Sequence, residues 1–283
     1  MENLPEMDFL AMLELQNGNE PSAQKLLRDS IKNNPSCISF NNLGVYYTQY
    51  GMIQKNGTIR SAKRIGLRYL IKAAEFGVDW RNYVSIATAL FDENAVADAY
   101  QWFSKAYELS TDICILYNIG VCLFRLGDYQ RAAEIFESLC DDISVSCIME
   151  ANGQNPYLIL AYCQYKLNMV QNCIDSIRKF REIWIVDDRF DTFCLRFLCG
   201  LFGEALSECR ELLDEWYPTT YILAMIVECM IQVPSFTFTL VEAELPITKH
   251  TWHLLWTNKV FRKKKIDEYT YIPPAICMYH FIK

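Results

Sequence analysis

The feature that most constrains the fold of this sequence is a small residue that recurs in pairs, twelve positions apart. These pairs are Ala11 with Ala23, Ala87 with Ala99, Gly120 with Ala132, and Ala161 with Cys173. A large apolar residue follows the second member four positions later, in turn Leu27, Phe103, Phe136 and Ile177. Because small side chains let two helices approach closely, the pattern predicts antiparallel helix pairs with one small residue on each helix.

The pairs belong to a longer repeat. The small residue of the first helix recurs at Ala11, Gly44, Ala87, Gly120 and Ala161, at intervals of 33, 43, 33 and 41 residues. Periods of this length are typical of arrays in which each repeat is one helix hairpin stacked on its neighbours. The two longer intervals indicate insertions near residues 50–60 and 144–154.

Several segments resemble the tetratricopeptide repeat (TPR), a helix–turn–helix motif of 34 residues. The first half of that motif is similar to Phe40-x2-Leu43-Gly44-x2-Tyr47 and Leu116-x2-Ile119-Gly120-x2-Leu123, and the second half to Ala99-x3-Phe103 and Ala132-x3-Phe136. The motif's tryptophan is replaced, by Phe40, Tyr83 and Leu116. Residues 66–77 resemble the related Sel-like repeat. The resemblance implies an all-α, right-handed α-solenoid of TPR-like helix hairpins with a non-repeat C-terminal cap.

We expect two regions. Residues 1–217 form the repeat array, with about five to six helix pairs, and residues 218–283 form a C-terminal helix and an irregular capping segment. Within the second region, residues 219–233 and 252–261 are predicted helical, and the alternation over 235–240 resembles a strand. A cap is expected because the end of a solenoid would otherwise expose an apolar face.

The resemblance also implies a concave groove, lined by the first helix of each repeat, that binds a partner protein or peptide. The groove candidates are Asn41, Val45, Thr48, Arg81, Val84, Thr88, Phe91, Tyr117, Val121, Phe124, Arg125, Leu158, Tyr162, Tyr165 and Lys166. The alternative is that many of them pack between neighbouring helices. If Tyr117 and Phe124 are aromatic anchors, replacing both by Ala should weaken partner binding and leave the helices intact.

Some TPR domains clamp the C-terminal carboxylate of chaperones with Lys and Asn. The matching positions here hold Asp8, Met12, Arg81 and Ser85, and Asn42 alone fits. A chaperone-tail adaptor is therefore not expected.

Charge and hydropathy exclude other classes. The sequence has 27 Lys and Arg against 34 Asp and Glu, a formal charge of −7, so nucleic acid is expected to bind only through local basic patches at Lys55–Arg68 and Arg262–Lys265. The simpler reading of both patches is a solvated surface. The start of the sequence has no signal-peptide pattern, and the most apolar stretch, 221–241, contains Glu228 and Pro234. We expect a cytoplasmic protein without a membrane partner.

No catalytic constellation is visible. Twelve cysteines occur singly, without a CxxC pair, and His250-x2-His253 has no complete ligand set around it. We therefore predict no cofactor, no metal and no enzymatic activity. The leading hypothesis is a non-catalytic interaction module, an adaptor or regulatory subunit, and the alternative is a ligand- or peptide-responsive sensor that controls a partner enzyme or effector by changing solenoid conformation.

Overall fold

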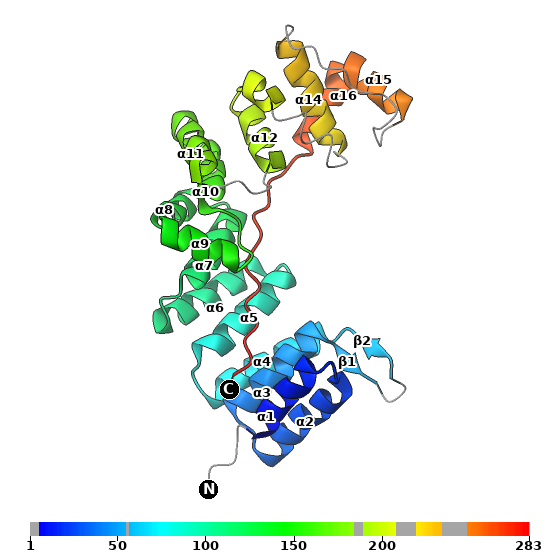
Figure 1. Cartoon of the computed structure of the whole chain (residues 1–283), viewed down its shortest axis with the longest axis vertical. Helices are drawn as coiled ribbons and strands as arrows, with labels where there is room; N and C mark the ends of the chain where they lie inside the picture. The colour runs from blue at the N-terminus through cyan, green and yellow to red at the C-terminus, as the bar shows by residue number, and fades with distance from the viewer. Residues whose placement is uncertain (1–5, 55–56, 184–188, 208–218, 234–247, 283) are drawn as a thin grey trace. The chain divides into compact units, whose positions relative to one another are not determined.

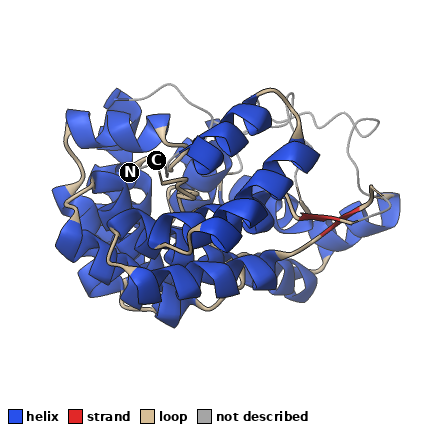
Figure 2. Ribbon diagram, turned by 90° about the horizontal axis from the view of Figure 1, so that it is seen from below, coloured by secondary structure: helices blue, strands red, loops and turns tan. Residues whose placement is uncertain are grey.

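The computed structural model describes residues 6–54, 57–183, 189–207, 219–233 and 248–282 (Figure 1). In this part of the chain, helices joined by short loops accompany a single two-stranded sheet (Figure 2). The chain divides into two compact units: the first holds residues 1–135, 141–153 and 274–283, and the second holds 136–140 and 154–273. The boundary predicted at residue 217 lies outside the described residues and stays a prediction.

The first unit is built of helices that follow the predicted hairpin pattern. They are α1 (Glu6–Gln16), α2 (Glu20–Asn33), α3 (Cys37–Gln49), α4 (Lys63–Phe76), α5 (Trp80–Asp92), α6 (Val96–Leu109), α7 (Ile113–Leu126), most of α8 (Tyr129–Ser138) and α9 (Asp142–Glu150). Helix α1 packs on α2, α3 on α4 and α5 on α6. The predicted small residues Ala11, Ala23, Ala87 and Ala99 are fully buried, as the helix-pair prediction requires.

Helices α3 and α4 approach each other closely. A Cβ atom on Gly66 would lie 2.7 Å from the carbonyl oxygen of Gly44 and 2.6 Å from the Cγ2 atom of Thr48. Since backbone cannot give way as a flexible side chain can, this contact requires glycine at residue 66. Gly44 is the predicted small residue of its repeat, and Gly66 lies opposite it in the second helix.

The two insertions have different structures. In the first, β1 (Met52–Ile53) pairs antiparallel with β2 (Ile59–Arg60). The Gln24 side chain of α2 binds both the N–H and the C=O of Ile53, at 2.8 and 3.0 Å, which fixes this hairpin on α2. The second insertion contains α9, whose first turn is capped by the Asp141 carboxylate through the N–H groups of Ile143 and Ser144.

The second unit contains α10 (Pro156–Lys166), α11 (Val170–Ile183), α12 (Arg189–Leu198), α14 (Thr220–Gln232), α15 (Lys249–Thr257) and α16 (Lys259–Asp267). Helix α14 coincides with the predicted helix over 219–233. The helix predicted over 252–261 is instead two helices, because the chain breaks at Asn258, whose side chain caps α16 at the N–H of Phe261. The strand-like run at 235–240 lies outside the described residues. No helix in the described part has the length and apolar character needed to cross a bilayer.

Candidate functional site

The last described residues form neither helix nor strand, and part of them lies on the first unit. Residues Pro274–Ile282, called the C-terminal segment below, run as an extended red trace beside α7, α5 and α3 (Figure 1). The side chains that bind its backbone come from these three helices, each the first helix of a hairpin. We call this set the A-helix face: Asn41 and Asn42 of α3, Ser85 of α5, and Tyr117 and Asn118 of α7.

Two asparagines each bind both backbone groups of one residue. The Asn118 amide accepts from the N–H of Ile276 at 2.8 Å and donates to its C=O at 3.0 Å. Asn42 binds the N–H and C=O of Ile282 in the same way, at 2.7 and 2.8 Å. A side-chain amide in this arrangement takes the place of a neighbouring strand, which holds an extended chain by its backbone.

Two further residues of the segment, His280 and Pro274, are also bound through their backbone. Ser85 Oγ accepts from the N–H of His280 at 3.1 Å, and Asn41 Nδ2 donates to its C=O at 2.7 Å. The Tyr117 hydroxyl donates to the C=O of Pro274 at 2.9 Å. All five side chains of the A-helix face are buried. Burial in such an arrangement makes loss of a partner expensive, because the remaining group is left without water or a hydrogen bond.

Contacts behind the face orient its amides. Asn82 Nδ2 donates to Asn41 Oδ1 at 3.1 Å, which leaves the Asn41 amino group to face His280. Asn42 Nδ2 also donates to the buried Asp8 carboxylate at 3.1 Å. Burial raises the pKa of Asp8, although hydrogen bonds from Ser30 and Asn42 act in the opposite direction.

Side chains of the C-terminal segment partly alternate between buried and exposed. Ile276, Met278 and Ile282 are buried, and Cys277 is exposed. Ile276 lies next to Gly153, where an added Cβ would approach its Cδ1 atom to 3.1 Å. The segment therefore combines backbone hydrogen bonds with apolar side-chain burial.

Two aromatic residues of the segment pack on the helices. Tyr279 and Phe281 lie against the buried cluster that contains Val45 and Leu70. The Tyr279 hydroxyl donates to Asp92 Oδ2 at 2.9 Å, and burial raises its pKa. These contacts add side-chain packing to the backbone contacts of the A-helix face.

The predicted groove residues of the first unit fall into two groups. Asn41 and Tyr117 bind the C-terminal segment directly, and Val45 packs in the cluster that Tyr279 and Phe281 contact. The rest interact with their own helices or neighbours. Their burial or contacts within the unit are consistent with the alternative reading, packing between helices; these residues are Thr48, Arg81, Val84, Thr88, Phe91, Val121, Phe124 and Arg125.

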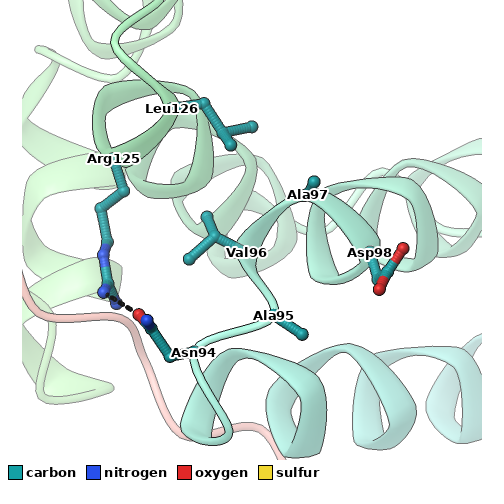
Figure 3. A pocket seen from close by; sticks show the side chains of 7 residues that line it. All are labelled: Asn94, Ala95, Val96, Ala97, Asp98, Arg125 and Leu126. Carbon is teal, nitrogen blue, oxygen red and sulfur yellow. Dashed lines mark hydrogen bonds between the residues drawn. The ribbon is translucent and has the colours of Figure 1, made fainter.

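Arg125 illustrates this second group. Its guanidinium lies over the Phe91 ring, 4.8 Å from the centroid, and donates to Asn94 Oδ1 at 2.6 Å. Figure 3 shows this hydrogen bond at the edge of a pocket between the α5–α6 turn and the end of α7.

Phe124 is buried against Tyr129, so the double alanine variant of Tyr117 and Phe124 would open cavities in the core. That variant cannot separate binding from stability.

In the second unit, Tyr162 of α10 is the predicted residue with the most contacts. Its ring stacks on Tyr271 at 3.6 Å between centroids, and its hydroxyl binds Tyr269 and the C=O of Asp191. Leu158 is buried, Tyr165 is half-buried and Lys166 is exposed.

Sequence reasoning missed the residue with the clearest geometry. Asn118 was not predicted, and Asn42 and Ser85 were considered only as parts of a carboxylate clamp. These three residues share a register, because each lies two positions before the small first-helix residue of its repeat, at Gly44, Ala87 or Gly120. A polar residue recurring at this position was the signal that could have identified the face.

The two basic patches predicted from the sequence, Lys55–Arg68 and Arg262–Lys265, differ in how far their arginines are buried. Arg262 is buried, pairs with Glu228 at 3.1 Å and donates to the C=O groups of Leu255 and Trp256, so it stabilises the contacts among α14, α15 and α16. Around the first insertion, Arg60, Lys63 and Arg64 are exposed. Within the described residues no group of three His, Cys, Asp or Glu side chains could hold a metal ion.

Comparisons with known proteins agree with the helical-repeat fold. Residues 115–142, which include Asn118, match the family model of the tetratricopeptide repeat. A tetratricopeptide repeat protein from Parabacteroides merdae superposes with a TM-score of 0.59 at 14% identity, covering 93% of this chain and 97% of that one. The pilF structure from Pseudomonas aeruginosa gives 0.52 at 16% identity, covering 82% and 92%. No curated protein matches the sequence significantly.

The fold is therefore an all-α array of TPR-like helix hairpins, as the sequence predicted. The fold resembles that of tetratricopeptide repeat proteins, and residues 115–142 match that family's model. Proteins of this class are generally non-catalytic modules for protein–protein interaction.

Proposed function

We propose that this protein is a non-catalytic adaptor or regulatory subunit that binds an extended segment of a partner protein on its A-helix face. The observation that carries the proposal is the hold of Asn42 and Asn118 on both backbone groups of Ile282 and Ile276. Helices of three successive hairpins contribute to this binding, so the face suits a chain of about the length of the C-terminal segment.

Backbone recognition supplies affinity, and the apolar contacts supply selectivity. Each hydrogen bond contributes a net 0.5–1.5 kcal/mol by order of magnitude, about the same for any non-proline residue. The side chains of Ile276 and Ile282 are buried, so the face should favour a partner with medium-sized apolar side chains at those positions. Polar and charged residues at the edge of the A-helix face then affect the association rate more than the binding affinity.

A selection from random peptides tests the proposal without a known partner. A phage-displayed library of 12-residue peptides is selected on the full chain, both as the wild type and as an Ile276→Pro variant in which the C-terminal segment loses its N–H bond to Asn118. We expect linear peptides from at least one form, and we expect their affinity to fall tenfold or more when Asn118 is replaced by Leu.

The matched control is Asn172→Leu, the same substitution at an exposed position of α11. Peptides that bind all variants alike would place binding elsewhere on the protein. The absence of Asn118-dependent peptides from both forms would refute the proposed function.

The second candidate is a peptide-responsive regulator. The observation that favours it is the position of the C-terminal segment, because a face covered by its own chain must change before it binds anything else. Small-angle scattering of the full chain with and without a selected peptide tests this candidate. An unchanged profile at saturation would count against a conformational response.

A further inference from the structure

The contacts of the C-terminal segment are those expected of a bound ligand. Three of its residues, Ile276, His280 and Ile282, have both N–H and C=O bound by side chains of the A-helix face. They are separated by four and two positions, so they lie on the same edge of an extended strand. On that edge, the backbone groups of these three residues are all bound by the helices.

These contacts span a large separation along the chain. Asn118 and Ile276 are 158 residues apart, and Asn42 and Ile282 are 240 apart. Local chain connectivity therefore does not force them together, and their own free energy must hold the segment in place. The buried side chains of Ile276, Met278 and Ile282 contribute to that free energy.

We propose that the C-terminal segment is a resident ligand that keeps the A-helix face closed, and that a partner binds by replacing it with an extended segment of similar pattern. The replacing segment has backbone N–H groups at the positions of Ile276, His280 and Ile282, which excludes proline there, and apolar side chains at the positions of Ile276, Met278 and Ile282. This inference rests on the proposed function and specifies both its partner and its regulation.

The physical consequence is a lowered apparent affinity. A tethered ligand acts at an effective concentration on the order of millimolar, so a free peptide with equal contacts competes poorly at micromolar concentration. Its apparent dissociation constant rises as the fraction of molecules with an open face falls. A segment docked for about nine-tenths of the time or more weakens a competitor tenfold or more.

The test measures peptide binding to the full chain by fluorescence anisotropy. The probe is a labelled peptide with the sequence of residues 274–282, with Ser in place of the exposed Cys277. It is titrated into the wild type and into a double variant that carries both Ile276→Pro and Ile282→Pro. The segment of this variant lacks the two N–H groups that donate hydrogen bonds to Asn118 and Asn42. We expect at least tenfold tighter binding to the double variant.

Two controls isolate the mechanism. Cys277→Pro places the same ring at an exposed position, and its affinity for the probe should equal that of the wild type. A probe that is N-methylated at the positions of Ile276 and Ile282 keeps its side chains but loses the two donors, and it should bind the double variant at least tenfold more weakly.

The outcomes separate the two proposals. Equal affinity for wild type and double variant would overturn the resident-ligand inference and leave the proposed function standing, since the face would then be open. Failure of the probe to bind either form would also overturn the resident-ligand inference. The proposed function would then be tested by the library selection alone. A mass that rises with protein concentration in light scattering would assign the segment to a second copy of the chain and overturn intramolecular closure.

A measurement on the wild type covers the case in which the proline variant does not fold. Amide hydrogen exchange of residues 276–282 is followed with and without saturating unlabelled probe peptide. Faster exchange of the resident segment on peptide binding supports replacement. Unchanged exchange with the peptide bound would show a different binding place and reject the inference.

Discussion

The side-chain amide of Asn118 binds both backbone groups of Ile276, accepting from its N–H at 2.8 Å and donating to its C=O at 3.0 Å. The two residues lie at the centre of α7 and near the end of the sequence, and both are buried. This relationship converts a helix of the repeat array into a binding surface for extended chain.

Replacing Asn118 by Leu should destabilise this arrangement without changing the helices. Leu has a similar branched shape but leaves the N–H and C=O of Ile276 without partners, at a cost of about 1–3 kcal/mol for each group that stays buried. We expect a lower free energy of unfolding in urea and faster amide exchange at Ile276. The same substitution at exposed Asn172 should leave both unchanged, and equal effects at the two positions would contradict the assignment.

Docking of the C-terminal segment should weaken at acidic pH because of His280. Burial lowers the pKa of His280 from its usual value of 6.5, against the opposing influence of Asp112 and Asp79, while Arg81 also lowers it. Its Nε2 atom is buried without a hydrogen-bond partner among the described residues, and its ring meets Trp80 edge-on at 5.5 Å.

The direction of this pH effect follows from the linkage between proton binding and folding. The native state binds the proton less readily than the unfolded chain, so the stabilisation is complete above about pH 6.5 and is lost as the pH falls below it toward the native pKa. Urea unfolding at pH 7.5 and 5.5 should show a larger loss for the wild type than for His280→Gln. An equal loss in both would remove His280 as the cause.

Gly66→Ala should disrupt the contact between α3 and α4. The new Cβ would lie 2.6 Å from Thr48 Cγ2 and 2.7 Å from the Gly44 carbonyl oxygen, so the helices must separate, at a cost of about 1–3 kcal/mol. Gly203 is also helical but has nothing within 4 Å of its Cβ position. Thermal unfolding should show a loss for Gly66→Ala and no loss, or a gain of up to about 1 kcal/mol, for Gly203→Ala. Similar melting temperatures for the two variants would contradict the close approach.

Cys173 and Cys199 should form a disulfide under mild oxidation. Their sulfur atoms lie 3.5 Å apart, and the hydrogen bond between them lowers the pKa of Cys199 and raises that of Cys173. Cys199 is the more accessible thiol, because Cys173 is buried, so we expect the Cys199 thiolate to react first. Diamide, which accepts the two hydrogens released, should give a peptide that links these residues in mass mapping. Cys277→Ser should retain this link, whereas Cys173→Ser should lose it. A dominant link from Cys199 to another cysteine would disprove the pairing.

Helix pairing could be predicted from the sequence because its signal is local. Ala11, Ala23, Ala87 and Ala99 recur at fixed spacing, and each is buried where its helices pack. The insertion near residues 50–60 was also visible as a longer interval, but its hairpin was not, because Gln24 of a different helix fixes Ile53.

The candidate site was predicted less well. Asn41 and Tyr117 were selected as residues of the first helices, and both bind the C-terminal segment. Phe91 and Arg125 were selected by the same rule but pair with each other. Sequence spacing shows which residues share a helix face, but it does not show which part of that face a neighbouring helix covers.

The paired helices of the first unit and their repeat could be predicted from the amino-acid sequence, since they depend on residues within one period of about 33 positions. What lies on the A-helix face became clear only from the folded chain, because the Asn42 side chain meets Ile282 across 240 residues and binds backbone groups that every residue except proline carries. The recurring polar residues mark the helices that can bind a backbone, but the bound segment carries no matching side-chain pattern, because its N–H and C=O groups are common to nearly all residues.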